Sequence, residues 1–189
     1  LAGLISPMHG EISLLGSAPG QLPTQVAYLP QHPVSSHTLP LCVQDVVAMG
    51  RYAHLGLFKR STDADRSIVL ESMKRTGIDG QANEPIRDLS GGQQQRTHLA
   101  QVLARQAEVL LLDEPTAGLD LNGRKAVAEL IATERARGVT VVLATHELAD
   151  AESANLVMLL AQRVVSLGAP AQALRDEYLR ECFGFTQPH

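Results

Sequence analysis

Two acidic residues stand at the end of a short apolar run, VLLLDEP, which covers residues 109–115. A run of this length is typical of a buried strand, and ligands bind at the carboxyl ends of parallel strands in open α/β sheets. Asp113 is suited to hold Mg²⁺, which prefers oxygen ligands and keeps much of its water shell. Glu114 is placed to polarise a water for attack on a phosphoryl group. For this motif alone, a strand that ends in two solvated acids is the alternative.

A second motif, LSGGQQQR at residues 89–96, has the composition of an anion site at the start of a helix. Glycines there let backbone N–H groups approach an anion, and the helix dipole favours negative charge at that end. Ser90 is suited to cap the helix and to donate its hydroxyl to a phosphate oxygen. An ordinary cap with a glycine turn is the alternative. Because LLLDEP follows within one helix and one strand, the two motifs together favour a phosphate site.

Three further polar residues are expected at the same edge of the sheet. Asp120 follows the acidic pair in the turn GLD. His146 ends the next strand in ATHE and is a candidate for a hydrogen bond to a terminal phosphate, although a lone histidine is more often structural. Gln31 ends the strand in YLPQ, and its amide is able to reach Mg²⁺ or a water.

The spacing of apolar residues predicts the elements that carry these motifs. Apolar runs separated by helix-length segments imply an α/β fold with a largely parallel sheet and right-handed crossovers. Uninterrupted apolar strands are expected when helices cover both faces of a sheet. The predicted strands are 11–16, 25–30, 108–115, 139–147, 156–161 and 163–168. The predicted helices are 43–49, 63–76, one from LSGG to 106, 121–136, one ending at 154, and a helical tail, with stops at Gly77 and Gly138.

The composition is that of an ordinary globular chain. Of its 189 residues 44% are hydrophobic and 19% charged, which suits one α/β domain. A net charge of −4 argues against sequence-independent binding of nucleic acid, which needs a basic face. Cys42 and Cys182 lie far apart and are expected as reduced thiols in a cytosolic protein. No apolar run approaches the roughly 18 residues that cross a bilayer, and residues 1–10 do not have the pattern of a signal peptide.

Taken in order, YLPQ, LSGGQQQR, VLLLDEP, GLD and ATHE resemble the Q-loop, signature, Walker B strand, D-loop and switch histidine of the nucleotide-binding subunit of an ABC transporter. Five motifs in this order make the resemblance specific, and it covers essentially the whole chain. It implies a P-loop NTPase (RecA-like) core at 1–32 and 89–189, with an inserted ABC-type helical subdomain at 33–88. It also implies an ATPase that is coupled to transmembrane transport and binds ATP and Mg²⁺.

The resemblance assigns a role to each motif residue. Asp113 organises Mg²⁺, and Gln31 senses the metal and couples to the membrane subunit. Glu114 is the general base, His146 contacts the γ-phosphate, and Asp120 communicates across a dimer. The residues that clamp the ATP held by a partner subunit are Ser90, Gly91, Gly92 and Gln93.

The same resemblance implies partners and a location. In this family two ATP-binding subunits form a head-to-tail dimer, in which one subunit's phosphate loop and the other's signature grip the same nucleotide. Integral membrane permease subunits bind the dimer, an extracytoplasmic substrate-binding protein acts indirectly, and no nucleic acid is involved. The chain is therefore expected to be cytoplasmic and peripheral on the cytoplasmic face of the bacterial inner membrane. Gln94 and Arg96 are expected to support the signature helix.

The Walker A phosphate loop of the family, G-x-x-x-x-G-K-[ST], does not occur in this sequence. In the family it precedes a segment like residues 1–12, so the chain is expected to start inside the helix that follows the loop. Gly118 and Gly123 have the required glycine spacing, but Arg124 replaces the lysine, and this position follows the acidic strand. We expect a truncated fragment rather than a degenerate subunit that lost the loop. In either case the chain alone is expected to be inactive, because the loop supplies most of the phosphate contacts.

The segment LPLCVQDVVAMGRYAHLGLFKR, residues 39–60, is similar to the zinc and manganese importer branch, in which V-x-D-V-V-x-M-G-R recurs at this point. Importers of siderophores or cobalamin carry a related segment and are the alternative substrate class. A non-catalytic pseudo-ATPase whose signature serves a competent partner is a further alternative. One apolar set is either subdomain core or a groove for a cytoplasmic helix of a membrane subunit: Tyr52, Leu55, Leu57 and Phe58.

Overall fold

The computed structural model describes residues 1–31, 40–55 and 60–184, which form two compact units, 1–144 and 145–189. The first unit contains β1 (Val26–Leu29), α1 (Val43–Ala48), α2 (Tyr52–Leu55), α3 (Asp63–Thr76), α4 (Gly91–Ala104), β2 (Val109–Asp113), α5 (Leu121–Ala136) and β3 (Thr140–Ala144). Short 3-10 turns lie at Met49–Arg51, Asp79–Gln81 and Ile86–Asp88. The second unit contains α6 (Leu148–Glu152), β4 (Val157–Leu160), β5 (Val164–Gly168), α7 (Pro170–Ala173) and α8 (Asp176–Phe183).

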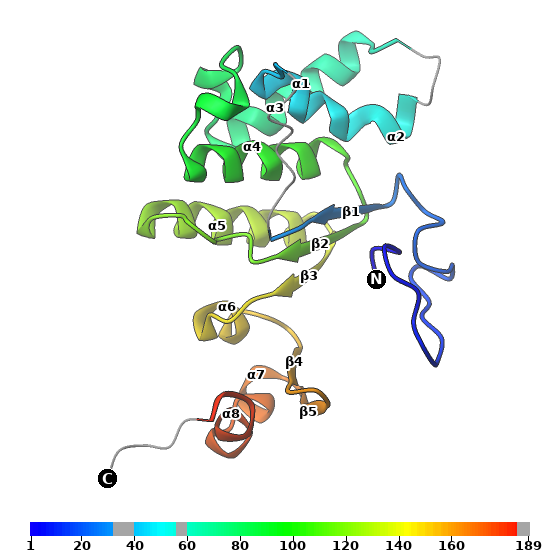
Figure 1. Ribbon diagram of the computed structural model, residues 1–189, viewed down its shortest axis with the longest axis vertical. Helices are drawn as coiled ribbons and strands as arrows, with labels where there is room; N and C mark the ends of the chain where they lie inside the picture. The colour runs from blue at the N-terminus through cyan, green and yellow to red at the C-terminus, as the bar shows by residue number, and fades with distance from the viewer. Residues whose placement is uncertain (32–39, 56–59, 185–189) are drawn as a thin grey trace. The chain divides into compact units, whose positions relative to one another are not determined.

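The first unit is built on a parallel sheet with strand order β1-β2-β3 (Figure 1). Leu29 of β1 pairs with Leu112 of β2, and Asp113 pairs with Ala144 at the end of β3. The carboxyl ends of the three strands therefore lie at one edge, as the sequence predicts. The strands are four or five residues long and end one to three residues before the predicted limits.

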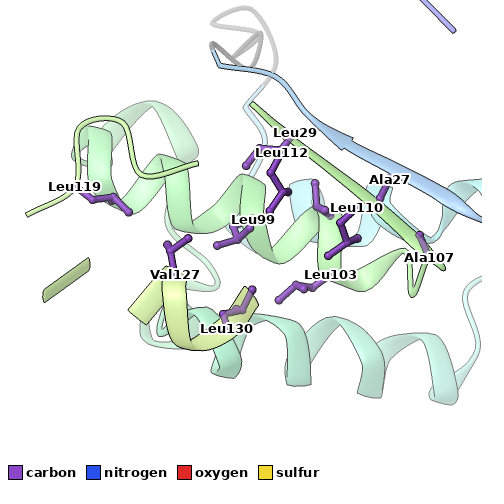
Figure 2. Close-up of a cluster of buried hydrophobic side chains, with 11 residues drawn as sticks. Ala27, Leu29, Leu99, Leu103, Ala107, Leu110, Leu112, Leu119, Val127 and Leu130 are labelled. Carbon is purple, nitrogen blue, oxygen red and sulfur yellow. The ribbon is translucent and has the colours of Figure 1, made fainter. Parts of the chain in front are cut away.

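One face of the sheet is covered by α4 and α5, which contribute to a single aliphatic core. Figure 2 shows Leu110 and Leu112 of β2 directed toward Leu99 of α4, with Val127 and Leu130 of α5 completing the cluster. These side chains are all less than a tenth exposed. Burial of apolar surface at about 25 cal/mol per Å² makes this cluster the main source of stability for the sheet.

The opposite face of the sheet carries Leu111 and Val142, which face residues 1–5 across a cavity. Residues 1–5 form no helix, and Leu4 and Ile5 are largely exposed. Val142 is 40% exposed. Helical cover, expected on both faces, is thus found on the face packed by α4 and α5, whereas extended chain lines the other.

Two predictions for the N-terminal segment are wrong. Residues 1–10 do not begin inside a helix, because Gly3 and Gly10 adopt positive φ and interrupt helical backbone. Residues 11–16 do not form a strand. Leu15 and Gly16, with φ of 52° and 77°, form a two-residue turn closed by paired backbone hydrogen bonds between Leu14 and Ser17. Positive φ at both central positions is the requirement of a tight hairpin turn, which reverses the chain inside the predicted strand.

The helices α1 and α3 pack with part of α4 around a second, separate core. Its centre is made of Val43 and Val47 of α1, Met73 of α3 and Ala100 of α4, each almost fully buried. The helix α3 has the predicted limits because Thr62 accepts a hydrogen bond from the Asp65 N–H at its start, and Gly77 ends it in the left-handed conformation. Local capping signals therefore define this helix.

The second unit holds the antiparallel pair β4–β5 and the short helices around it. Val157 and Leu159 of β4 pack with Ala173 of α7 in a small core. Both strands were predicted and lie within the expected ranges, and α6 ends two residues earlier than predicted. Across the described part of the chain, no helix is long and apolar enough to cross a membrane.

Candidate functional site

The acidic pair lies where β2 leaves the sheet. Glu114, directly after the strand, adopts φ of 50°, a left-handed conformation that costs a residue with a Cβ of the order of 1 kcal/mol. Its backbone N–H donates to the Ala144 carbonyl at 2.9 Å, and its carbonyl accepts from Ala117 N–H at 3.0 Å. The neighbouring strand and the following turn therefore hold Glu114 in this conformation. The chain turns sharply here, and both carboxylates are half-buried at the sheet edge.

Asp113 has the surroundings of an oxygen ligand. It borders a cavity of about 310 Å³ that is lined on its other sides by residues 1–5, Tyr28 and Ala144. Gln31 is exposed two residues after β1, at the end of the strand that neighbours β2. Mg²⁺ bound with phosphates needs only one or two carboxylates from a protein. The donors present fit such an ion, and among the described residues no three His, Cys, Asp or Glu side chains form a metal-binding group.

The LSGG motif forms the start of α4 through a reciprocal capping arrangement. The Gln93 N–H donates to Ser90 Oγ at 3.3 Å, and the Ser90 N–H donates to Gln93 Oε1 at 2.8 Å. Ser90 and Gly91 are exposed, and a Cβ added to Gly91 would meet nothing within 4 Å. An anion thus has open access to the first N–H groups of a 14-residue helix, which carry the positive end of its dipole.

Two contacts from α4 to the turn after Glu114 were not predicted from the sequence. Gln95, 7% exposed, donates from Nε2 to the carbonyl oxygen of Pro115 at 3.0 Å. Gly92 lies against the GLD turn, since a Cβ added to it would stand 3.4 Å from Leu119 Cδ2. A run of three glutamines does not reveal which one turns inward. Gln94 donates to Leu89 O at 3.1 Å, within its own end of the helix, in keeping with a supporting role.

Asp120 acts in this structure as the N-cap of α5. Its Oδ1 accepts a hydrogen bond of 2.8 Å from the Gly123 N–H. The side chain is exposed and stands two residues after Gly118, which adopts φ of 72°. Gly118 and Gly123, which have the glycine spacing of a phosphate loop, therefore lie in a tight turn and in the first turn of α5. The Asp120 carboxylate caps that helix start.

His146 belongs to the second unit, in the segment that precedes α6. Its side chain is 70% exposed, and its Nε2 lies 3.8 Å from Glu147 Oε1. Thr145 fixes the local backbone: its hydroxyl donates to Asp150 Oδ2 at 2.9 Å and accepts from the Glu147 N–H at 3.0 Å. The histidine is thus an exposed residue on a hydrogen-bonded turn, as a ligand-contacting side chain requires.

The apolar set after α1 is only partly described. Tyr52 is 59% exposed and Leu55 is half-buried, and α2 contributes no buried side chain. Tyr52 is therefore not part of the core formed by α1, α3 and α4. Leu57 and Phe58 lie outside the described residues.

The sheet, the acidic turn and the glycine-led helix define a P-loop NTPase fold of the kind found in ATP-binding domains of transporters, and solved structures agree. The chain matches cbiO1 of Clostridium perfringens, part of the ABC transporter complex cbiONQ, with a TM-score of 0.73 and 26% identity. The match covers 97% of this chain and 76% of that one. A second structure is described as a metal-chelate type ABC transporter in an inward-facing conformation. It matches with a TM-score of 0.82 and 28% identity, and the match covers 96% of this chain and 69% of that one.

The chain belongs to the ABC transporter family, whose model matches residues 1–117. It is 34% identical over 185 residues to the manganese transport system ATP-binding protein MntB of Bacillus subtilis, which covers 97% of this chain and 74% of the relative. It is equally 34% identical over 185 residues to the zinc transport system ATP-binding protein TroB of Treponema pallidum, covering 97% and 70%. The ferric enterobactin transport ATP-binding protein FepC of Escherichia coli is 33% identical over 192 residues, covering 97% and 70%.

Proposed function

We propose that this chain is the ATP-binding subunit of an importer for a divalent metal ion, zinc or manganese, and that its signature completes the nucleotide site of a partner subunit. The observation that carries the proposal is the exposed start of α4. Ser90 and Gly91 present unobstructed backbone N–H groups at the positive end of a long helix. The nucleotide whose phosphates they contact is held by the partner, in a head-to-tail dimer.

The predicted catalytic and metal-binding residues have complementary roles. Asp113, with Gln31, would hold Mg²⁺, which neutralises phosphate charge when it is bound. Glu114, whose left-handed backbone conformation follows the end of the strand, accepts a proton from the attacking water. His146 donates a hydrogen bond to the terminal phosphate. Asp120, at the start of α5, contacts the partner subunit.

The 189-residue chain by itself is proposed to lack ATPase activity. Backbone amides and the lysine of a phosphate loop supply most of the grip on the β- and γ-phosphates. The glycine turn at Gly118 does not replace that loop, because the α5 start behind it is capped by Asp120. Mg²⁺-dependent ATPase activity of the isolated chain, abolished by Glu114→Gln, would contradict this part of the proposal.

The division into subdomains supports docking on a permease at the cytoplasmic face of the membrane. We assign residues 1–32 and 89–189 to the ATP-binding core and 33–88 to the helical subdomain, in keeping with two separate aliphatic cores in the first unit. Tyr52, exposed on α2, is proposed to contact a cytoplasmic helix of the permease. Tyr52→Ala is expected to weaken association with the permease without unfolding the chain.

A metal ion is the favoured cargo because several relatives from different organisms that match more than nine-tenths of the chain are named for manganese or zinc transport. An importer of iron chelates is the second candidate, supported by the similarity to FepC. Uptake of manganese by B. subtilis cells whose MntB is disabled in its own signature tests the choice. Restoration by this chain supports the metal assignment, whereas restored ferric enterobactin uptake in E. coli cells whose FepC is disabled in its own signature favours the alternative.

The proposal that the signature, Ser90 to Gln93, completes a partner's nucleotide site (the half-site proposal) is tested by mixing this chain with B. subtilis MntB that carries a substitution in its own signature. Neither protein alone is expected to hydrolyse ATP, and the mixture is expected to show Mg²⁺-dependent hydrolysis. Gly91→Ala in this chain is expected to abolish the activity, because a methyl group would stand in the path of the phosphate. The helix tolerates alanine at this open position, so the fold is retained.

Gly80→Ala is the matched control, since it also adds a methyl group at an open glycine but lies outside the signature, in the 3-10 turn Asp79–Gln81. It is expected to leave the activity of the mixture intact. Hydrolysis that never rises above that of the separate proteins, or that persists in Gly91→Ala, would overturn the proposal.

A further inference from the structure

The turn from Glu114 to Leu119 is held by bonds from the sheet, from within the turn, from α5 and from α4. The sheet supplies one, from Glu114 N–H to Ala144 O. The turn supplies two of its own, from Ala117 N–H to Glu114 O and from Leu119 N–H to Thr116 O. Arg124 of α5 donates from Nε to Leu119 O at 3.4 Å, and Gln95 of α4 donates from Nε2 to Pro115 O at 3.0 Å. The Gln95 bond joins the turn to the signature helix.

The Gln95 bond is shielded from water. Gln95 and Thr116 are each 7% exposed, and the Pro115 side chain is fully buried. A buried carbonyl that loses its only side-chain donor keeps the cost of desolvation without compensation.

The same two elements also touch one turn earlier on α4. The backbone of Gly92 meets the side chain of Leu119, which is itself part of the core with Leu99 and Val127 (Figure 2). The packed contact at Gly92 thus directly follows the signature residues Ser90 and Gly91, and the buried hydrogen bond at Gln95 lies about one helical turn further on. Both contacts end on the turn that starts with Glu114.

We propose that Gln95 is a positioning residue that makes the signature start of α4 and the acidic turn 114–119 move as one unit. It reaches neither the nucleotide nor the water and acts through Pro115, the residue after the proposed base. Binding of a partner's nucleotide at Ser90 and Gly91 then tightens the turn that carries Glu114. The inference rests on the proposed function, because it needs a partner's nucleotide at the signature.

Hydrogen–deuterium exchange of backbone amides in the intact chain tests the bond itself. Gln95→Met keeps the length of the side chain and removes the donor. Exchange at Ala117 and Leu119 is expected to rise about fivefold, the effect of losing one ordinary hydrogen bond. Gln94→Met is the matched control, because it removes a glutamine bond to Leu89 O on the same helix and none to the turn. It is expected to leave Ala117 and Leu119 unchanged.

The proposed coupling between nucleotide binding at the signature and the turn 114–119 is tested by adding B. subtilis MntB loaded with Mg²⁺ and the non-hydrolysable analogue AMP-PNP. In the parent chain, exchange is expected to slow at Gly91 and Gly92 and also at Ala117 and Leu119. In Gln95→Met the slowing is expected to remain at the two glycines and to be lost at Ala117 and Leu119. If Gln95 only stabilised the fold, Gln95→Met would not remove the response of Ala117 and Leu119 while keeping that of Gly91 and Gly92.

The outcomes separate failure of the inference from failure of the function. No slowing at Gly91 and Gly92 in the parent chain would contradict the half-site proposal. Slowing at the glycines together with an unchanged response of Ala117 and Leu119 in Gln95→Met would overturn the positioning role of Gln95. Equal effects of Gln95→Met and Gln94→Met on the turn would overturn it as well.

Discussion

Gly50 lies so close to the backbone of Gln101 that a Cβ added to it would stand 2.2 Å from the Gln101 carbonyl oxygen. Gly50 belongs to the 3-10 turn after α1, and Gln101 lies in α4. Ala104 closes the site further, with its Cβ 3.1 Å from the same point. A backbone carbonyl does not move aside as the end of a flexible side chain does, so the approach of α1 to the signature helix requires glycine here.

Gly50→Ala is therefore expected to lower the free energy of unfolding by about 3 kcal/mol, the upper end of the usual cost of overpacking a core. Urea unfolding measures the loss. Gly80→Ala, which meets nothing within 4 Å, is expected to change the same quantity by less than about 0.5 kcal/mol. Equal stabilities of the two variants would show that α1 and α4 are free to separate.

Asp65 at the start of α3 makes stability depend on acid pH. Its pKa is lowered to about 2, first by hydrogen bonds from the hydroxyl and the N–H of Thr62 and then by Arg51, whose Nε donates to it at 3.0 Å. An unfolded aspartate has a pKa of about 3.9. The stabilisation is therefore fully present above about pH 4 and is lost as pH falls toward 2.

Asp65→Asn is expected to be less stable than the parent at pH 7, and the difference is expected to shrink between pH 4 and pH 2. Urea unfolding across this range provides the measurement. Asp63→Asn, on the same helix at a position whose side chain is 94% exposed, is the control for replacing a carboxylate. A constant difference for Asp65→Asn would contradict the assigned pKa.

His98 is expected to make stability depend on pH nearer neutrality. Its ring is buried in α4, with Nδ1 3.4 Å from Gln101 Oε1, and among the described residues Nε2 has no hydrogen-bond partner. Burial lowers the pKa of His98 below its usual 6.5. Because the unfolded chain binds the proton more readily, stability is complete above about pH 6.5 and decreases as pH falls below it.

His98→Met removes this titration. The free energy of unfolding of His98→Met is expected to rise relative to that of the parent when the pH is lowered from about 7.5 to 5.5. This range is set by the unperturbed histidine pKa. His9→Gln, at an exposed position, is the control for replacing a histidine. If the parent and His98→Met lose stability in parallel, His98 is not the titrating group.

Elements with local signals could be predicted closely from the sequence. Thr62 and Gly77 bracket α3 at the predicted limits, because a side-chain cap and a left-handed glycine act within a few residues. The strand β2 and the acidic pair at its end follow from an apolar run too short for a helix. The start of α4 follows from Ser90, which caps it as predicted.

Features that depend on approach between elements could not be predicted. Gln95 and Gln94 are adjacent in sequence and alike in chemistry, and only the packing of α4 on the turn at Pro115 distinguishes them. Gly50 reads in sequence as an ordinary glycine near a helix end. The strand predicted at 11–16 failed for the opposite reason: its apolar pattern is real, but Leu15 and Gly16 reverse the chain within it.

Glu134 of α5 joins the two cores of the first unit. Its carboxylate accepts from Arg75 of α3 and, at 3.3 Å, from Arg137, and its side chain is only 9% exposed. Arg75 is itself 20% exposed, so the pair is shielded far better than a surface ion pair. Removing one partner leaves a largely buried charge without compensation, which costs more than the pair contributes.

A double-mutant cycle of Arg75→Met and Glu134→Gln is expected to give a coupling energy of about 2 kcal/mol in urea unfolding, the size found for charged groups that hydrogen-bond out of water. The cycle of Arg66→Met and Asp63→Asn is the control, because that pair on α3 is 64% and 94% exposed and should couple by less than about 0.5 kcal/mol. Salt at about 1 M should reduce the control coupling and largely spare the buried one. Equal couplings would mean that α3 and α5 are held together by apolar contacts alone, and that Glu134 is dispensable for joining the helical region to the sheet.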